Sequence, residues 1–228
     1  MTLARRAAAE GIGTALLVAT VIGSGIAASR LSPDDVGLQL LENSLATGAV
    51  LVALIMTLQP VSAAFNPLIS AVETSFGEIR STEAGVLAAA QIAGGVVGAV
   101  IANLMFDLAP VSWSDQTRDG GGVLLGEVVA TFGLVLVVFG GLRSGRVETL
   151  AFAVGGYIAA AYWFTSSTSF ANPAVTIGRM FSDTFAGIAP ASVFPFVLAQ
   201  ATGAALGAVT VRLLFPGSTP LPRGVSLE

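Results

Sequence analysis

The chain has 228 residues, of which 54% are hydrophobic and 11% charged, and its formal net charge is -4 at pH 7. Cysteine, histidine and lysine are absent, which excludes disulfides, thiolate and imidazole metal sites, and a nucleophile with an adjacent base. The charge is too small and too dispersed for nucleic-acid binding. We therefore expect no enzyme, no cofactor and no metal, and the apolar composition indicates a protein of the lipid bilayer.

Six apolar segments are long enough to cross a membrane as helices. In chain order they are 8–28, 40–58, 85–108, 122–141, 149–164 and 193–215. Two shorter segments, each of about ten residues, begin at Asn66-Pro67 and Asn172-Pro173 and are too short to span a bilayer as helices. We therefore expect an all-α membrane protein with six transmembrane helices and two re-entrant half-helices.

The two halves of the chain resemble each other. Residues 90–106, AQIAGGVVGAVIANLMF, align without gaps on residues 199–215, AQATGAALGAVTVRLLF, and the Asn-Pro pairs recur in the same order. Because each half holds three spans, an odd number, the second half enters the membrane from the opposite side, which predicts an inverted 3+3 repeat. The expected divisions are 1–110 for the first repeat, 111–121 for an outer loop, 122–215 for the second repeat and 216–228 for a mobile tail.

The arginines indicate an orientation. With both termini in the cytoplasm, seven arginines lie inside and three outside, in agreement with the positive-inside rule. The inside set is Arg5, Arg6, Arg80, Arg143, Arg146, Arg212 and Arg223, and the outside set is Arg30, Arg118 and Arg179. We expect a multi-pass protein of the cell (inner) membrane.

Each Asn-Pro pair is suited to starting a helix, with asparagine as the N-cap and proline at the first helical position. If the half-helices enter from opposite faces, their positive N-terminal ends meet near the midplane and repel cations. The asparagine oxygen caps the helix, so the NH2 group can donate to a solute, while carbonyls of residues 63–65 and 170–171 can accept.

These features resemble the major intrinsic protein family, the aquaporins and glycerol facilitators. The resemblance runs from about Glu10 to Phe215 and rests on the two Asn-Pro motifs, an early glutamate in each half and the Gln-x-x-Gly-x-x-x-Gly helices. It implies a homotetramer with one pore per subunit. The central pore motif is then Asn66, Pro67, Leu68, Asn172, Pro173 and Ala174. The family usually has alanine where Leu68 stands, and Leu68 is either a neutral packing change or a tighter central contact.

The outer filter departs further from the family pattern, which usually places an arginine directly after the second Asn-Pro-Ala. That position is Val175 here, and ungapped spacing carries the other filter positions to Ala46, Ala160 and Ser169. A shift of one or two residues would bring Tyr157 or Trp163 nearby. Four small or medium, uncharged side chains predict a filter wider than that of a water-selective channel.

Three charged residues carry further hypotheses. Arg179 lies one helical turn beyond Val175, and either replaces the missing guanidinium at the outer vestibule or pairs with Asp183 at the surface. The resemblance implies that Glu10 and Glu127 brace the half-helix loops, with a proton relay as the alternative.

We expect a passive channel for small uncharged solutes: glycerol-like polyols, urea or neutral metalloid acids such as arsenite, together with water. The missing filter arginine resembles an arsenic-linked bacterial branch of the family, which adds methylated arsenicals. The alternatives are an ion- or proton-coupled transporter, a water-selective channel, and a membrane scaffold with a vestigial pore.

Overall fold

The computed structural model describes residues 1–216, so from residue 217 on the expected tail lies outside the described residues. The six long helices are α1 (Leu3–Leu31), α2 (Val36–Leu58), α4 (Ser81–Met105), α5 (Gly121–Arg143), α6 (Leu150–Phe164) and α8 (Pro190–Leu214). The two short ones are α3 (Pro67–Ser75) and α7 (Pro173–Arg179), and a 3-10 turn, η1 (Val147–Thr149), precedes α6.

All six long helical segments are long and apolar enough to cross a membrane, α6 when taken together with η1. The expectation of six spans plus two short helices is therefore confirmed. Local chemistry sets several starts: the Asp35 carboxylate accepts from the N–H of Leu38 at 2.9 Å to cap α2, and Pro190 occupies the first turn of α8.

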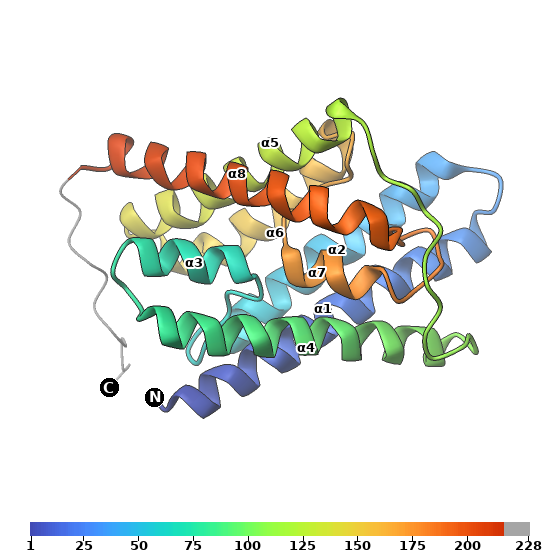
Figure 1. Cartoon of the computed structure of the whole chain (residues 1–228), viewed down its shortest axis with the longest axis horizontal. Helices are drawn as coiled ribbons and strands as arrows, with labels where there is room; N and C mark the ends of the chain where they lie inside the picture. Colours follow the sequence, from blue (N-terminus) through green and yellow to red (C-terminus); the bar gives the residue numbers. More distant parts are fainter. Residues whose placement is uncertain (217–228) are drawn as a thin grey trace.

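The half-helices lie at the centre of the bundle. Figure 1 shows α3 and α7 placed end to end between α4 and α8, with α1 packed along α4 and α5 along α8. Glycine permits the α1–α4 contact, because a Cβ atom on Gly94 would lie 2.2 Å from the carbonyl oxygen of Gly11. The corresponding glycine of α8, Gly203, packs equally closely on α5, where a Cβ would lie 2.3 Å from the Val128 carbonyl oxygen.

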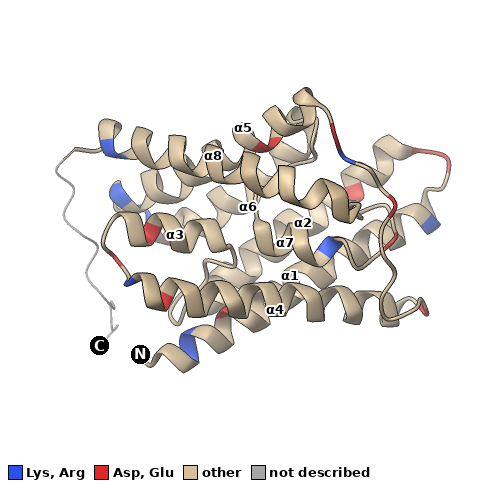
Figure 2. Cartoon of the chain, in the orientation of Figure 1, with Lys and Arg blue, Asp and Glu red and all other residues tan. Residues whose placement is uncertain are grey.

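The bundle has two ends, which we name by their contents. The near face is the end at which α1 begins and α8 ends, and the far face holds the long connection 106–120 between α4 and α5. Charged residues gather toward these ends (Figure 2). This distribution leaves the middle of the long helices with few charged side chains, as a bilayer requires.

Candidate functional site

Both half-helices start as the sequence predicts, with asparagine as the cap and proline in the first turn. The side-chain oxygen of Asn66 accepts from the N–H of Leu68 at 3.0 Å. That of Asn172 accepts from the N–H groups of Ala174 at 2.9 Å and Val175 at 3.3 Å. Each asparagine thus satisfies backbone donors that would otherwise be exposed at a helix start.

The two asparagines also tie the half-helices together. The Asn66 NH2 group donates to the carbonyl of Ala171 at 2.8 Å, and the Asn172 NH2 group donates to the carbonyl of Phe65 at 2.7 Å. Each NH2 group has a second hydrogen that takes no part in these bonds and can still be donated. The Phe65 and Ala171 carbonyls each accept one of these bonds and keep a second lone pair, so their expected contact with a solute stays a prediction.

The residues before the asparagines adopt an uncommon backbone conformation. Phe65 has φ 48° and Ala171 has φ 50°, both in the left-handed region. This conformation costs a non-glycine residue about 1–2 kcal/mol, so the surrounding contacts have to hold it. A buried glutamate beside each loop supplies such contacts.

Glu10 holds the first loop through both of its carboxylate oxygens. Oε1 accepts from the Ser62 hydroxyl at 2.5 Å and the Ala64 N–H at 2.9 Å. Oε2 accepts from the Phe65 N–H at 2.6 Å and from the side chain of Gln91 at 2.8 Å. The carboxylate is fully buried, and these four donors offset its loss of hydration.

Glu127 does the same for the second loop. Its carboxylate accepts from the N–H groups of Phe170 and Ala171, both at 2.9 Å, and from the side chain of Gln200 at 2.6 Å. This is the geometry that a brace requires. The partners of both glutamates are backbone, hydroxyl and amide groups, and none of these partners is a charged side chain.

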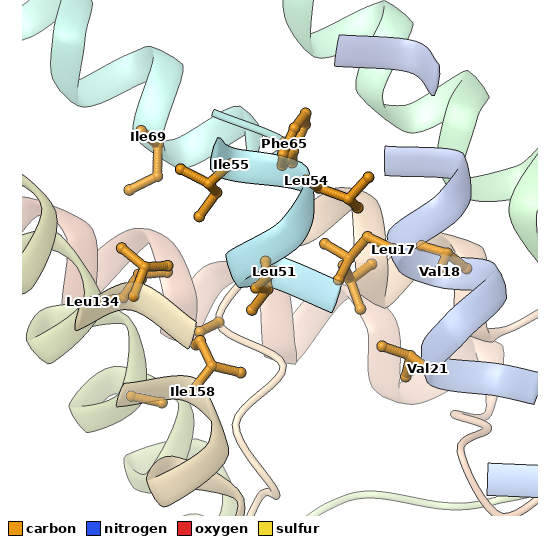
Figure 3. Close-up of a cluster of buried hydrophobic side chains, with 14 of the residues drawn as sticks. Leu17, Val18, Val21, Leu51, Leu54, Ile55, Phe65, Ile69, Leu134 and Ile158 are labelled. Carbon is orange, nitrogen blue, oxygen red and sulfur yellow. The ribbon is translucent and has the colours of Figure 1, made fainter. Parts of the chain in front are cut away.

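A cavity of about 90 Å³ passes the paired asparagines. It runs from Val138 and Leu150 toward the near face to Tyr162 and Arg179 toward the far face. Its wall is mostly apolar, and Figure 3 shows part of it, where side chains from α2, α3, α5 and α6 lie around a common space. Those four helices contribute Leu51, Ile55, Ile69, Leu134 and Ile158 to the lining.

A second cavity of about 320 Å³, the far-face vestibule, lies beyond the first. Tyr162 and Arg179 line both cavities and therefore mark the boundary between them. The Tyr162 hydroxyl lies 3.1 Å from that of Thr47, which also lines the first cavity. We call this boundary the constriction.

Two of the expected filter residues lie elsewhere. Ala46 is half-buried, Ala160 is exposed on the outside of α6, and neither lines either cavity. The cavity is lined instead by Thr47, one position after Ala46, and by Tyr162, two positions after Ala160. One residue turns a helix by about 100°, so this small error in spacing moves a side chain to another face.

The expectation of a filter without aromatic residues is therefore wrong. Tyr162 was missed, and the two neighbours considered in its place have other partners. The Tyr157 hydroxyl donates to the carbonyl of Ala130 at 3.0 Å, and the Trp163 indole donates to the Ser44 hydroxyl at 3.1 Å.

Ser169 and Val175 both line the cavity close to the constriction. The Ser169 hydroxyl is buried and has no hydrogen-bond partner among the described residues. Val175 is 6% exposed and presents an apolar surface where relatives of the expected family usually have arginine. The free hydroxyl is thus one of the few groups here that can bond a solute.

Arg179 is only 2% exposed. Its Nε donates to the carbonyl of Ala186, and its guanidinium carbon lies 3.4 Å from the centre of the Phe170 ring. The carboxylate of Asp183 instead accepts from the backbone N–H of Asp115 at 3.1 Å. The structure therefore brings Arg179 to the constriction and not into a surface ion pair with Asp183.

Leu68 lies apart from the cavities. It is half-buried against the apolar core and lines neither of them, and both interpretations of Leu68 stay predictions. Among residues 1–216, no group of three or more carboxylates is placed to hold a metal ion.

Six membrane-length helices, with two half-helices joined by paired asparagines beside a cavity, define a channel-type membrane protein. The chain belongs to the major intrinsic protein family, whose model matches residues 1–147. It is 46% identical over 227 residues to the aquaglyceroporin AqpS of Rhizobium meliloti (strain 1021), covering 99% of this chain and 97% of that protein.

The X-ray structure of the aquaglyceroporin from Plasmodium falciparum has the same fold. Its TM-score is 0.71 at 19% identity, and the match covers 94% of this chain and 96% of that one. These comparisons confirm the expected family and fold, and they confirm that the protein is a channel and not an enzyme.

Proposed function

We propose that the protein is a passive channel for small uncharged solutes, with glycerol-like polyols, urea and neutral metalloid acids such as arsenite as candidates, together with water. The cavity beside the paired asparagines carries this proposal. Its lining includes no carboxylate, and its polar groups are few: chiefly the two asparagines and the side chains of the constriction. A neutral solute can replace part of its hydration by hydrogen bonds to these groups. An ion loses more hydration free energy than its contacts with the wall restore.

Electrostatics support the exclusion of cations. The N-terminal ends of both half-helices point at the same stretch of the cavity, and helix N-termini carry partial positive charge. Arg179 adds a full positive charge at the constriction. A passing cation therefore meets positive potential at two successive levels.

The solute range follows from the constriction. Val175 is shorter than an arginine and leaves the cavity that it lines with Tyr162 less obstructed, which favours solutes larger than water. The two relatives named above are both called aquaglyceroporins, which supports the same range. Methylated arsenicals remain in the proposal as larger neutral candidates, and water selectivity is the alternative.

Topology and assembly complete the proposal. We interpret residues 1–110 and 122–215 as inverted repeats, place the near face in the cytoplasm because most arginines lie there, and expect a homotetramer with one pore per subunit.

Light scattering from reconstituted proteoliposomes tests the proposal. We expect permeability to water, glycerol, urea and arsenite above that of empty vesicles, and no accumulation against a gradient. Accumulation driven by a proton gradient would identify a coupled transporter. Flux of water alone would identify a water-selective channel, and flux equal to that of empty vesicles would favour a scaffold.

The substitution Val175→Arg tests the placement of the filter. We expect glycerol permeability to fall roughly tenfold, which corresponds to a rise of about 1.4 kcal/mol in the barrier, while water flux falls less. Val175→Ala is the matched control, since it removes volume at the same position and should retain glycerol flux. A folded Val175→Arg protein with wild-type glycerol flux would remove this residue from the filter.

A further inference from the structure

Two arginines of the far-face vestibule share one aromatic ring. The guanidinium carbon of Arg179 lies 3.4 Å from the centre of the Phe170 ring, and that of Arg118 lies 5.0 Å from it. Arg118 comes from the connection between α4 and α5, whereas Arg179 ends α7. Residues far apart in the sequence thus bring two positive charges to the same cavity, and both line it.

The same two arginines are fixed by one backbone segment. Arg118 donates to the carbonyls of Gly187 at 2.8 Å and Phe185 at 3.4 Å, and Arg179 donates to that of Ala186 between them. These bonds use Nε of both arginines and Nη2 of Arg118. Both terminal nitrogens of Arg179 and Nη1 of Arg118 have no acceptor among the described residues, so guanidinium N–H groups are left over.

Neither of these charges is in contact with a carboxylate among the described residues. Neither arginine has a carboxylate within ion-pair distance among residues 1–216, and the side chain of Asp183 bonds the backbone of Asp115. Glu127 attracts both guanidinium groups at longer range, but its carboxylate is buried and bonds the N–H groups of Phe170 and Ala171. A charge as buried as that of Arg179 is unfavourable without a counter-charge in contact, so an anion that reaches the guanidinium groups is bound favourably there.

The rest of the vestibule is rich in hydrogen-bonding groups and contains no acid. Arg118 and Arg179 are its charged lining residues, and Tyr162 is the other titratable one. The remaining polar lining residues are Asn43, Gln116, Thr117 and Thr168. The Asn43 amide already donates to the Val21 carbonyl and the Ser24 hydroxyl. The two arginines are therefore the principal free donors of the vestibule.

We propose that the far-face vestibule binds a small oxyanion, of the size and chemistry of sulfate or phosphate, between Arg118 and Arg179. Guanidinium groups suit oxyanions because their planar N–H groups match pairs of oxygen atoms. Since Arg179 also forms the constriction, a bound anion lies across the entrance and slows neutral solutes. This site is separate from the proposed solute range, because the anion binds without passing through.

Thermal unfolding of the purified full-length protein tests the site, with sodium sulfate compared with sodium chloride at equal ionic strength. We expect a saturable rise in the unfolding midpoint with sulfate, because a ligand that binds only the folded state stabilises it. Arg118→Gln should weaken the apparent affinity roughly tenfold, the effect of losing one charge-assisted hydrogen bond. Sulfate also stabilises proteins nonspecifically, but that effect does not saturate and does not depend on Arg118.

Arg30→Gln is the matched control. Arg30 also lies at the far face, and its guanidinium lies 5.2 Å from the ring centre of Phe106 and donates to the carbonyl of that residue at 2.8 Å. It does not line the vestibule, so its loss should leave the sulfate response intact. A response that is equal in wild type and Arg118→Gln, or equally lost in Arg30→Gln, would overturn the proposal.

Two further measurements keep the test decisive. If Arg118→Gln does not fold, Arg118→Lys takes its place, and unchanged sulfate affinity in that variant counts against guanidinium contacts. In proteoliposomes, external sulfate should lower glycerol flux relative to chloride in wild type and less so in Arg118→Gln. Absence of glycerol flux in both salts would refute the proposed function but leave the unfolding measurement valid.

Discussion

The two half-helices, α3 and α7, match at some positions and differ at others when residues are counted from their asparagines. Four residues on, Ser70 and Thr176 accept from the glutamines that also bond the bracing glutamates, at 3.3 and 2.8 Å. Six residues on, Val72 of α3 corresponds to Gly178 of α7. The next residue is Glu73 in α3 and Arg179 in α7.

The matching positions lie near the paired asparagines, and the differing positions lie toward the two mouths. The centre therefore needs the same contacts in both halves, because each loop has a residue in the left-handed conformation directly before the asparagine that caps its half-helix. The ends are free to diverge: Glu73 of α3 lines neither cavity, whereas Arg179 of α7 lines both, so the two mouths are chemically distinct. The two mouths therefore differ even though the centre is nearly symmetric.

The largest effect is expected from giving α7 the residue that α3 has. A Cβ on Gly178 would lie 2.7 Å from the carbonyl oxygen of Gly95, a backbone atom of α4 that cannot move away freely. We expect Gly178→Val to lower the free energy of unfolding by about 3 kcal/mol or more, measured by thermal unfolding in detergent. Val72→Ala is the comparison and should cost about 2 kcal/mol as a simple loss of buried methyl groups. A wild-type midpoint for Gly178→Val would show that α7 does not need this close approach.

A second test separates the charged ends. Arg179→Gln removes a guanidinium from the constriction, and we expect the ratio of glycerol to water permeability to rise roughly threefold to tenfold, a barrier change of about 1 kcal/mol. Glu73→Gln should leave the ratio unchanged, because Glu73 lines neither of the cavities described above. Stopped-flow measurements on both variants decide the matter. Equal changes in the two variants would mean that the mouths act alike.

The smallest effect concerns the near-face end of α3. Burial raises the pKa of Glu78, in the connection after α3, and Arg143 partly opposes this. The folded state therefore holds a proton that the unfolded state releases, so stability is lost as pH rises from the usual value of about 4.3 through the raised pKa. We expect Glu78→Gln to raise the unfolding midpoint at pH 8 by about 1 °C and to have no effect near pH 4.

Glu148→Gln provides the control for that measurement. It removes the same charge from η1, at the same face, where the side chain is exposed. A pH-dependent shift of equal size in Glu148→Gln would show that the effect comes from the change in net charge and not from the burial of Glu78.

Much of this architecture could be predicted from the sequence because it occurs twice. The paired Asn-Pro motifs, Glu10 and Glu127 stand out by repetition, and each has a local chemical role that the surrounding residues reveal. The constriction does not repeat in this way. Tyr162 lies on α6, a helix that is apolar on nearly every side, so hydrophobic periodicity could not tell its inner face from its outer face.

Residue spacing failed for a related reason. Between α6 and Asn172 the chain passes through Thr168 and Ser169, which have φ of 60° and 52°, so a count of residues there does not translate into position along the channel. Arg118 is more remote still, since its place depends on bonds to the segment 185–187. The single signal that indicates Tyr162 is its spacing from Val154 and Ile158, four residues apart on one helix face.

The crossed bonds from Asn66 to the Ala171 carbonyl and from Asn172 to the Phe65 carbonyl also bear on biosynthesis. The first loop is made more than a hundred residues before the acceptor that its asparagine needs. During insertion Glu10 can bond the first loop, but the bond from Asn66 cannot form until the second loop is in place. Neither half of the chain can therefore complete its own re-entrant segment, and each acts as the template on which the other finishes folding.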